Sequence, residues 1–193
     1  MRVLAYVALL ALAACAPDFR TASRQLAVGL EPRETFVQRR TSYFDAENTR
    51  LRREWSYEVL ANGAQRPHGR DVQNYSDGTR EYERDFVHGE PAGRWRSWWP
   101  DGKSRMEAEY GTKEAQPMRW WHATGELEAE GLALNGVKTG PWRHLRADGT
   151  LEAEGEYVAG QRSGEWNLYD ERGQLAERVE FRRGVRVRRI SPQ

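Results

Sequence analysis

Histidine and glutamate are the residue types with which this sequence could hold a metal ion or transfer a proton. Its four histidines are His68, His88, His122 and His144. They fall at different offsets within an internal repeat, and no carboxylate or thiol recurs with them at metal-ligand spacing. A single surface histidine needs no ligand role. We therefore expect no metal site and no cofactor.

Glutamates recur in the segments 126–130 and 151–157, where they alternate with apolar or small residues. Paired carboxylates can serve as acid and base in glycoside hydrolysis. Carboxylates that alternate along a strand opposite arginines instead form a solvated ladder, which is the interpretation we favour. No serine or cysteine nucleophile stands with a plausible base, and no phosphate-binding loop can be read. The sequence predicts that the protein is not an enzyme.

Three aromatic residues form the candidate binding surface. Trp98, Trp121 and Tyr169 each stand four residues before a turn glycine, with the parity of the charged face, and Leu145 fills the fourth place. Such a row could bind a glycan or a protein partner, because aromatic rings bury much area at little entropic cost. The alternative is that the rings only cover the second face of a thin sheet, with Trp98 stacked on Arg105.

An internal repeat supplies the elements that position these side chains. The turn glycines Gly78, Gly102, Gly125, Gly149 and Gly173 follow one another at intervals of 24, 23, 24 and 24 residues. A second glycine falls eleven residues later in four units, at Gly89, Gly136, Gly160 and Gly184. A tryptophan precedes the turn glycine by seven in three units, as Trp95, Trp142 and Trp166, with Asp71 and Met118 in the other two. A fixed period of this length indicates a tandem repeat protein.

Residues within a unit alternate with period two, which is typical of a half-buried strand. The predicted fold is all-β, an elongated meander of β-hairpin repeats that forms a twisted antiparallel sheet. Asp-Gly between two strands favours a two-residue type I′ turn.

That turn sets a register that can be checked. It places Trp95 opposite Ala108, Trp142 opposite Gly155 and Trp166 opposite Val179, and on the other face Arg96 opposite Glu107, Arg119 opposite Glu130 and Arg143 opposite Glu154. We expect these arginines and glutamates to form cross-strand ion pairs. We also expect the Trp142 indole to lie flat on the backbone of Gly155.

The N-terminus carries the signature of a secreted lipoprotein. A short positive region and an apolar stretch, residues 3–11, lead to Leu12-Ala13-Ala14-Cys15. This resembles the bacterial lipobox, which implies cleavage before Cys15 and lipidation of its thiol. Ala16 after the cysteine favours the outer membrane by the same resemblance. The alternative is an ordinary signal peptide that leaves a free thiol, a liability in an oxidising envelope.

The predicted organisation has five parts. These are a signal peptide (1–14), a tether (15–40), a degenerate first repeat (41–68), five repeats (69–187) and a tail (188–193). The third unit lacks one residue and carries Gln116-Pro117-Met118, so we expect a bulge or kink there. The Arg-rich end of the last repeat suits a capping strand.

The unit Gly140 to Leu151, together with Glu154, Tyr157, Gly160 and Gly164, resembles the MORN-repeat variant of bacterial proteins often labelled as YwqK-family antitoxins. The resemblance covers about residues 69–187. It implies a repeat of β-hairpins and, through the label, neutralisation of a toxin. It implies no active site, since the family is defined by its repeat.

The balance of charged residues excludes one class of partner. The 30 basic and 29 acidic side chains nearly cancel, so no nucleic-acid partner is expected. We predict a non-catalytic protein anchored to the outer membrane through Cys15, facing the periplasm, that binds another envelope protein. Toxin neutralisation, and glycan or peptidoglycan binding through the aromatic row, are the alternatives.

Overall fold

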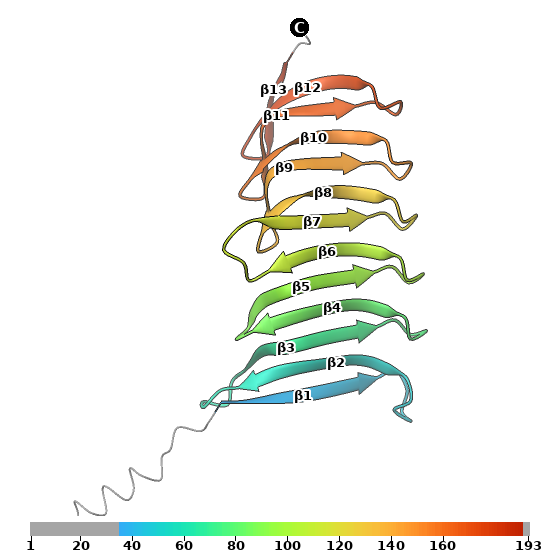
Figure 1. Cartoon of the computed structure of the whole chain (residues 1–193), viewed down its shortest axis with the longest axis vertical. Coiled ribbons are helices and arrows are strands. Elements are labelled where there is room, and N and C mark those ends of the chain that lie inside the picture. Colours follow the sequence, from blue (N-terminus) through green and yellow to red (C-terminus); the bar gives the residue numbers. More distant parts are fainter. Residues whose placement is uncertain (1–34, 191–193) are drawn as a thin grey trace, which may run out of the picture. The chain divides into compact units, whose positions relative to one another are not determined.

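The computed structural model describes residues 35–190. The predicted signal peptide, Cys15 and the tether up to residue 34 lie outside these residues, as do residues 191–193. The described chain forms one 13-stranded antiparallel sheet in which each strand pairs with its neighbours in sequence (Figure 1). This confirms the predicted all-β meander of hairpins. Within residues 35–190, no helix long and apolar enough to span a membrane is found.

The strands are β1 (Phe36–Tyr43), β2 (Leu51–Val59), β3 (Gln65–Asn74), β4 (Arg80–Val87), β5 (Glu90–Trp98), β6 (Ser104–Tyr110), β7 (Gln116–Trp121), β8 (Leu127–Leu134), β9 (Val137–Leu145), β10 (Leu151–Val158), β11 (Gln161–Tyr169), β12 (Leu175–Arg182) and β13 (Val185–Ile190). Strand β1 takes in Phe36 to Arg40 of the predicted tether. Strand β13 extends to Ile190, past the predicted end of the repeats.

The Asp-Gly turns differ from the expected type. At Asp148-Gly149, Arg146 donates its backbone N–H to the Thr150 carbonyl and Gly149 donates to the Arg146 carbonyl. These bonds close a three-residue loop in which Gly149 has a positive φ of 81° and Asp148 does not. Aspartate is useful here because its carboxylate accepts the Thr150 N–H at 2.9 Å. The prediction of a type I′ turn at this dipeptide is wrong.

Two-residue turns of type I′ lie along the opposite edge of the sheet, where the second glycine of each unit falls. Each begins with a non-glycine residue at φ between 49° and 52° and continues with a glycine at φ between 77° and 91°. The four turns are His88-Gly89, Asn135-Gly136, Ala159-Gly160 and Arg183-Gly184. Positive φ at both positions is the requirement of this turn.

The predicted register is correct in spite of the wrong turn type. All three tryptophan pairs are present, Trp95 with Ala108, Trp142 with Gly155 and Trp166 with Val179. The reason is that the longer loop displaces the pairing by one residue and a β-bulge displaces it back. The register shifts just beyond the turn glycine in all five repeats.

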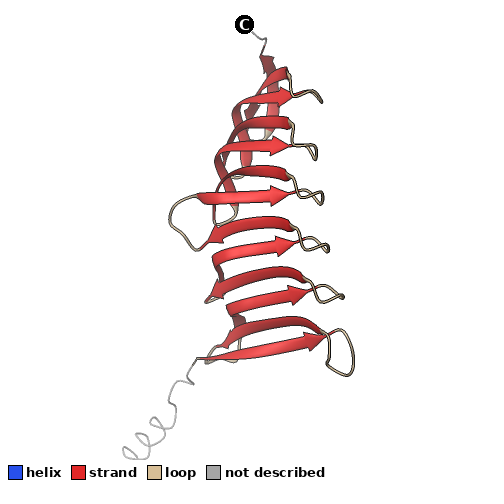
Figure 2. Ribbon diagram, turned by 45° about the vertical axis from the view of Figure 1, so that its right-hand side comes forward, coloured by secondary structure: helices blue, strands red, loops and turns tan. Residues whose placement is uncertain are grey.

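The core forms one cluster of buried residues on one face of the sheet, and the C-terminal strands of this sheet are curved (Figure 2). Trp142 and Trp166 are exposed by only 1% and 0%. The Tyr157 ring packs edge-on against both indoles, at centroid distances of 5.9 and 5.2 Å. Aromatic rings therefore supply the burial for which this sequence has too few aliphatic residues.

Each core indole rests on the strand that precedes its own. A Cβ added at Gly131 would lie 2.4 Å from Cδ2 of Trp142, and one added at Gly155 would lie 2.4 Å from Cδ2 of Trp166. Gly155 therefore seats Trp166, and the expectation that it seats Trp142 is wrong. The indole N–H of Trp142 donates to the Leu132 carbonyl at 2.7 Å, which fixes the ring over the preceding strand.

The third repeat departs from the others through a loop rather than through a special bulge. Strands β6 and β7 pair at only two positions, Met106 with Trp120 and Glu107 with Arg119. The segment 111–115 between them forms a wide connection, which Figure 2 shows at the edge of the sheet. Gly111 in this connection donates its N–H to the Asn135 side chain at 2.9 Å.

Candidate binding surfaces

Charged residues form a continuous row across the face opposite the core. Consecutive strands from β4 to β12 place one residue each in direct register: Glu83, Arg96, Glu107, Arg119, Glu130, Arg143, Glu154, Asn167 and Arg178. We call this set the charge row. It arises because the same repeat position falls on the outer face in every hairpin. No other element of the described residues lies on this face.

The ion pairs within the charge row only partly match the expected ones. Arg119 pairs with Glu130 at 3.5 Å, as predicted. Arg143, however, bonds to Glu130 on β8 rather than to Glu154 on β10. Three of the four arginines, Arg96, Arg119 and Arg143, face a glutamate on both neighbouring strands, so the register alone does not decide which glutamate each one bonds.

Arg96 shows the same preference for the preceding strand. It bonds to Glu83 at 3.0 Å rather than to the predicted Glu107. Glu154 instead accepts hydrogen bonds from the Tyr169 hydroxyl at 2.6 Å and from Asn167 at 3.1 Å. The Tyr169 hydroxyl is the main cause that holds the pKa of Glu154 below its ordinary value.

The predicted aromatic row lies beside the charge row, near the Asp-Gly edge. Trp98, Trp121 and Tyr169 are all half-buried. They sit at the ends of β5, β7 and β11, so at least one other strand separates any two of them. The guanidinium of Arg96 lies 5.5 Å from the centre of the Trp98 ring, whereas Arg105 stacks on Trp99 at 4.6 Å. The expected stacking of Trp98 on Arg105 is therefore wrong.

Three shallow hollows follow one another along the charged face. Arg94, Glu107 and Pro117 line a hollow of about 300 Å³. Pro117 and Pro141 line the next, of about 430 Å³. Pro141 and Glu154 line the third, of about 530 Å³. Neighbouring hollows share lining residues, Pro117 and Arg119 between the first two and Pro141 and Arg143 between the last two.

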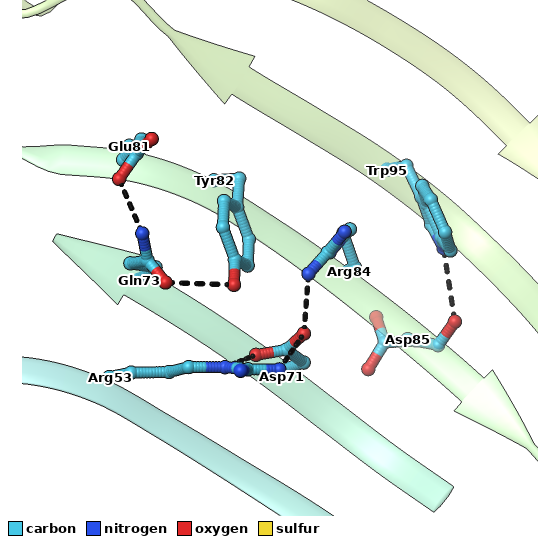
Figure 3. Close-up of polar contacts among 8 residues, drawn as sticks. All are labelled: Arg53, Asp71, Gln73, Glu81, Tyr82, Arg84, Asp85 and Trp95. Atoms are coloured by element: carbon cyan, nitrogen blue, oxygen red, sulfur yellow. Dashed lines mark hydrogen bonds and ion pairs between the residues drawn. The ribbon is translucent and has the colours of Figure 1, made fainter. Parts of the chain in front are cut away.

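A buried carboxylate organises the opposite, core face at the N-terminal end (Figure 3). Asp71 is 3% exposed and occupies the repeat position that holds tryptophan elsewhere. Arg53 bonds to both of its oxygens, at 2.8 and 3.1 Å, and Arg84 bonds to it at 2.7 Å. The bond with Asp71 is the main cause that raises the pKa of Arg53. Arg84 in turn occupies the position of the seating glycines and stacks on Tyr82 at 3.9 Å.

A cavity of about 250 Å³ lies beside this network. Its lining residues include Asp71, its partners Arg53 and Arg84, and the aromatic residues Trp55 and Phe86. Within the described residues, Arg84 Nε is one of two buried side-chain polar atoms without a hydrogen-bond partner. The cavity can therefore offer cationic donors and ring faces to a small ligand.

The described residues contain one cluster with metal-ligand chemistry, and sequence reasoning missed it. Glu58, His68 and His88 bring one possible ligand atom each to within 4.8 Å of the others. They come from β2, β3 and the β4–β5 turn, so no short sequence spacing links them. The signal available in sequence was that two of the four histidines lie ten residues on either side of Gly78.

The comparisons with known proteins add no relative. The chain matches no protein-family model and no curated protein. What can be said about function therefore depends on the repeat pattern and on the surfaces described above.

Proposed function

We propose that this protein is a non-catalytic, lipid-anchored envelope protein whose repeat sheet binds another envelope protein. The single observation that carries this proposal is the outer face, on which the charge row crosses nine strands beside the three hollows and the aromatic row. Aromatic rings beside arginines are the composition typical of protein-binding surfaces.

The charge row also suits a partner with its own alternating charges. Exposed ion pairs contribute only about 0–1 kcal/mol each to folding. Their arginines and glutamates can therefore exchange partners at low cost when another surface meets them. Complementary charges would then set orientation and association rate more than affinity.

Two alternative functions use the same face. Trp98, Trp121 and Tyr169 favour glycan or peptidoglycan binding, because half-buried rings can stack on sugar rings. The resemblance to the MORN-repeat variant favours neutralisation of a secreted or periplasmic toxin.

Pull-down of the tagged full-length protein from solubilised membranes separates these functions. The test variant carries Trp98→Ala, Trp121→Ala and Tyr169→Ala, and the control carries Val158→Ala and Val185→Ala, two exposed residues in the strands at the other edge. Loss of one specific protein in the test variant alone supports protein binding, and its sequence tells whether it is a toxin. Loss of retention on purified cell wall supports glycan binding. Equal behaviour of both variants contradicts a role for the aromatic row.

The membrane anchor is tested at Cys15. We expect metabolic labelling with an acyl-chain analogue to mark the wild-type protein and to fail with Cys15→Ser. Two or more acyl chains give a stable anchor where one is marginal, so the variant should also leave the membrane fraction. A variant that still labels and stays in the membrane would exclude lipidation at this residue.

A further inference from the structure

Three side chains with metal-ligand chemistry converge at the two-residue-turn edge near the N-terminal end of the sheet. His88 Nδ1 lies 2.9 Å from Glu58 Oε2, and His68 Nδ1 lies 4.0 Å from the same oxygen. The two imidazole rings lie 5.0 Å apart. The turn that carries His88 is fixed on β3 because Gly89 donates its N–H to the Pro67 carbonyl at 2.8 Å.

The carboxylate of this cluster is buried and ionised. Glu58 is 5% exposed and, with Asp71, is one of two buried charged residues in the part of the chain that the structure describes. Its Oε2 accepts a hydrogen bond from Arg66 and lies within hydrogen-bond distance of His88 Nδ1. Unlike Asp71, which two arginines neutralise, Glu58 has a single arginine partner, Arg66, whose Nε lies 2.6 Å away.

The hydrogen bonds around His88 cannot all be satisfied at once. Its Nδ1 lies 2.9 Å from Glu58 Oε2, which can only accept, and 3.1 Å from Arg66 Nη2, which can only donate. If Nδ1 carries a proton, it can donate to the Glu58 carboxylate but cannot accept from the Arg66 guanidinium. If Nδ1 carries none, it can accept from Arg66 but cannot donate to Glu58. His68 Nδ1 accepts the backbone N–H of His88 at 3.2 Å, a hydrogen bond that a metal bound at this nitrogen would replace. Glu58, His68 and His88 nevertheless bring one possible ligand atom each to within 4.8 Å of the others.

We infer that Glu58, His68 and His88 form a binding site for Zn²⁺, and that the guanidinium of Arg66 holds this site closed in the absence of the metal. Two imidazole nitrogens and one carboxylate oxygen are a common three-residue zinc ligand set, with the fourth position left to water. The exposed ring of His88 leaves that position open to solvent.

Zinc binding requires three local adjustments, the first of which is loss of the hydrogen bond from the His88 backbone N–H to His68 Nδ1. Ligand atoms around tetrahedral zinc lie within about 3.5 Å of one another, so the half-buried His68 ring must move inward from its 4.0 Å separation. Arg66 must turn away, which its 39% exposed side chain permits. A single carboxylate oxygen with two nitrogens disfavours Ca²⁺ and Mg²⁺, which prefer oxygen ligands.

The test is Zn²⁺ titration of the full-length chain, purified without a polyhistidine tag and followed by calorimetry. We expect one saturable site per chain, and a binding constant reduced about tenfold or more in His68→Gln and in His88→Gln, since loss of outer-shell partners alone costs 10–100-fold. Arg66→Gln should bind Zn²⁺ more tightly than wild type, because the competing guanidinium is gone. Mg²⁺ and Ca²⁺ should give no saturable binding.

A spectroscopic measurement locates the metal independently of affinity. Imidazole nitrogen resonances of His68 and His88 should shift with one equivalent of Zn²⁺, while those of His122 and His144 stay in place. Melting curves without metal establish that each variant is folded. Any one of four outcomes would overturn the inference: no stoichiometric site in the wild type, wild-type affinity in both histidine variants, shifts confined to His122 or His144, or unchanged or weaker binding by Arg66→Gln.

Discussion

At the scale of single residues, the core depends on pairs in which a large ring covers a residue without a side chain. Gly131 seats Trp142 and Gly155 seats Trp166. In the repeat around Gly78, Asp71 stands at the position of the tryptophan and Arg84 at that of the seating glycine, and the two form an ion pair. A buried ion pair is sensitive to loss of either partner, so the two ends of the sheet owe their packing to different chemistry.

The seating pairs can be tested by a double-mutant cycle. Gly155→Ala should destabilise the fold by about 1–3 kcal/mol, the usual penalty of overpacking, because the new Cβ would meet Trp166 at 2.4 Å. The penalty should persist with Trp142→Leu and shrink with Trp166→Leu, measured by chemical denaturation. Glu154→Ala, on the outer face, should cost under about 1 kcal/mol. The opposite dependence on the two tryptophans would mean that the seats are misassigned.

His144 should make stability depend on pH. Burial, then the nearby charges of Lys138 and Arg162, lower the pKa of His144 from 6.5 to about 4. Between these values the unfolded chain binds a proton that the folded chain refuses, so stability is complete above pH 6.5 and falls as the pH drops toward 4. We expect the urea midpoint to fall less between pH 7 and pH 5 in His144→Gln than in wild type. Equal losses in both would assign the acid sensitivity to other groups.

At the scale of elements, side chains in the loops at the Asp-Gly edge bond to the neighbouring repeat. At the Asp-Gly edge, the residue three before the turn glycine donates a side-chain hydrogen bond to a carbonyl of the next repeat in four units: Tyr75 to Trp98, Trp99 to Trp121, His122 to Leu145 and Arg146 to Tyr169. The fifth unit has Asp170 there, which accepts N–H groups of its own turn instead. The loops of one edge are therefore linked from repeat to repeat.

The two-residue turns offer a position where stability can be gained. Ala159 adopts a φ of 49° in its type I′ turn, a conformation that costs most residues about 1–2 kcal/mol and asparagine less. Ala159→Asn should therefore stabilise the protein by about 0.5–1 kcal/mol. Ala147→Asn is the matched control, because Ala147 is exposed in an Asp-Gly loop and has no positive φ. A gain of the same size in the control would rule out the turn as its cause.

At the scale of the whole molecule, the sheet is a row of hairpins in which each strand pairs through its backbone only with its neighbours in sequence. Every strand from β2 to β12 pairs on both sides, and β1 and β13 each pair on one. Arginines on β13 bond to Glu177 and Glu180 of β12, and charged residues on edge strands discourage pairing with other chains. The terminal strands β1 and β13 thus form the two edges at which the sheet ends.

Strand β1 should contribute to stability although most of its residues are exposed. A chain that begins at Thr41 loses Gln38, which accepts the hydroxyl of the buried Tyr57, and Arg40, which stacks on the same ring at 4.6 Å. We expect its melting temperature to lie below that of a chain that begins at Thr35, by about 2–4 °C for each kcal/mol lost. Identical melting temperatures would show that β1 adds nothing to the fold.

The sequence by itself determined the repeat, the strands and the register. Period-two alternation and regularly spaced glycines are local signals, and a hairpin's pairing depends only on its own residues. The register of Trp142 with Gly155 could be predicted even with the wrong turn type, because the extra loop residue and the bulge cancel. The position of the aromatic row, at the ends of alternate strands on the outer face, follows from the same residue spacing and alternation.

Only the tertiary structure decided which neighbour each side chain uses. Every inner strand belongs to two hairpins, so Trp142 faces both Gly131 and Gly155, and Arg143 faces both Glu130 and Glu154. Repeat spacing describes these neighbours equally well, whereas sheet curvature and side-chain packing favour one of them. The cluster of Glu58, His68 and His88 depends on the same effect over a longer distance, because a turn after β4 must reach back across β3 to the end of β2.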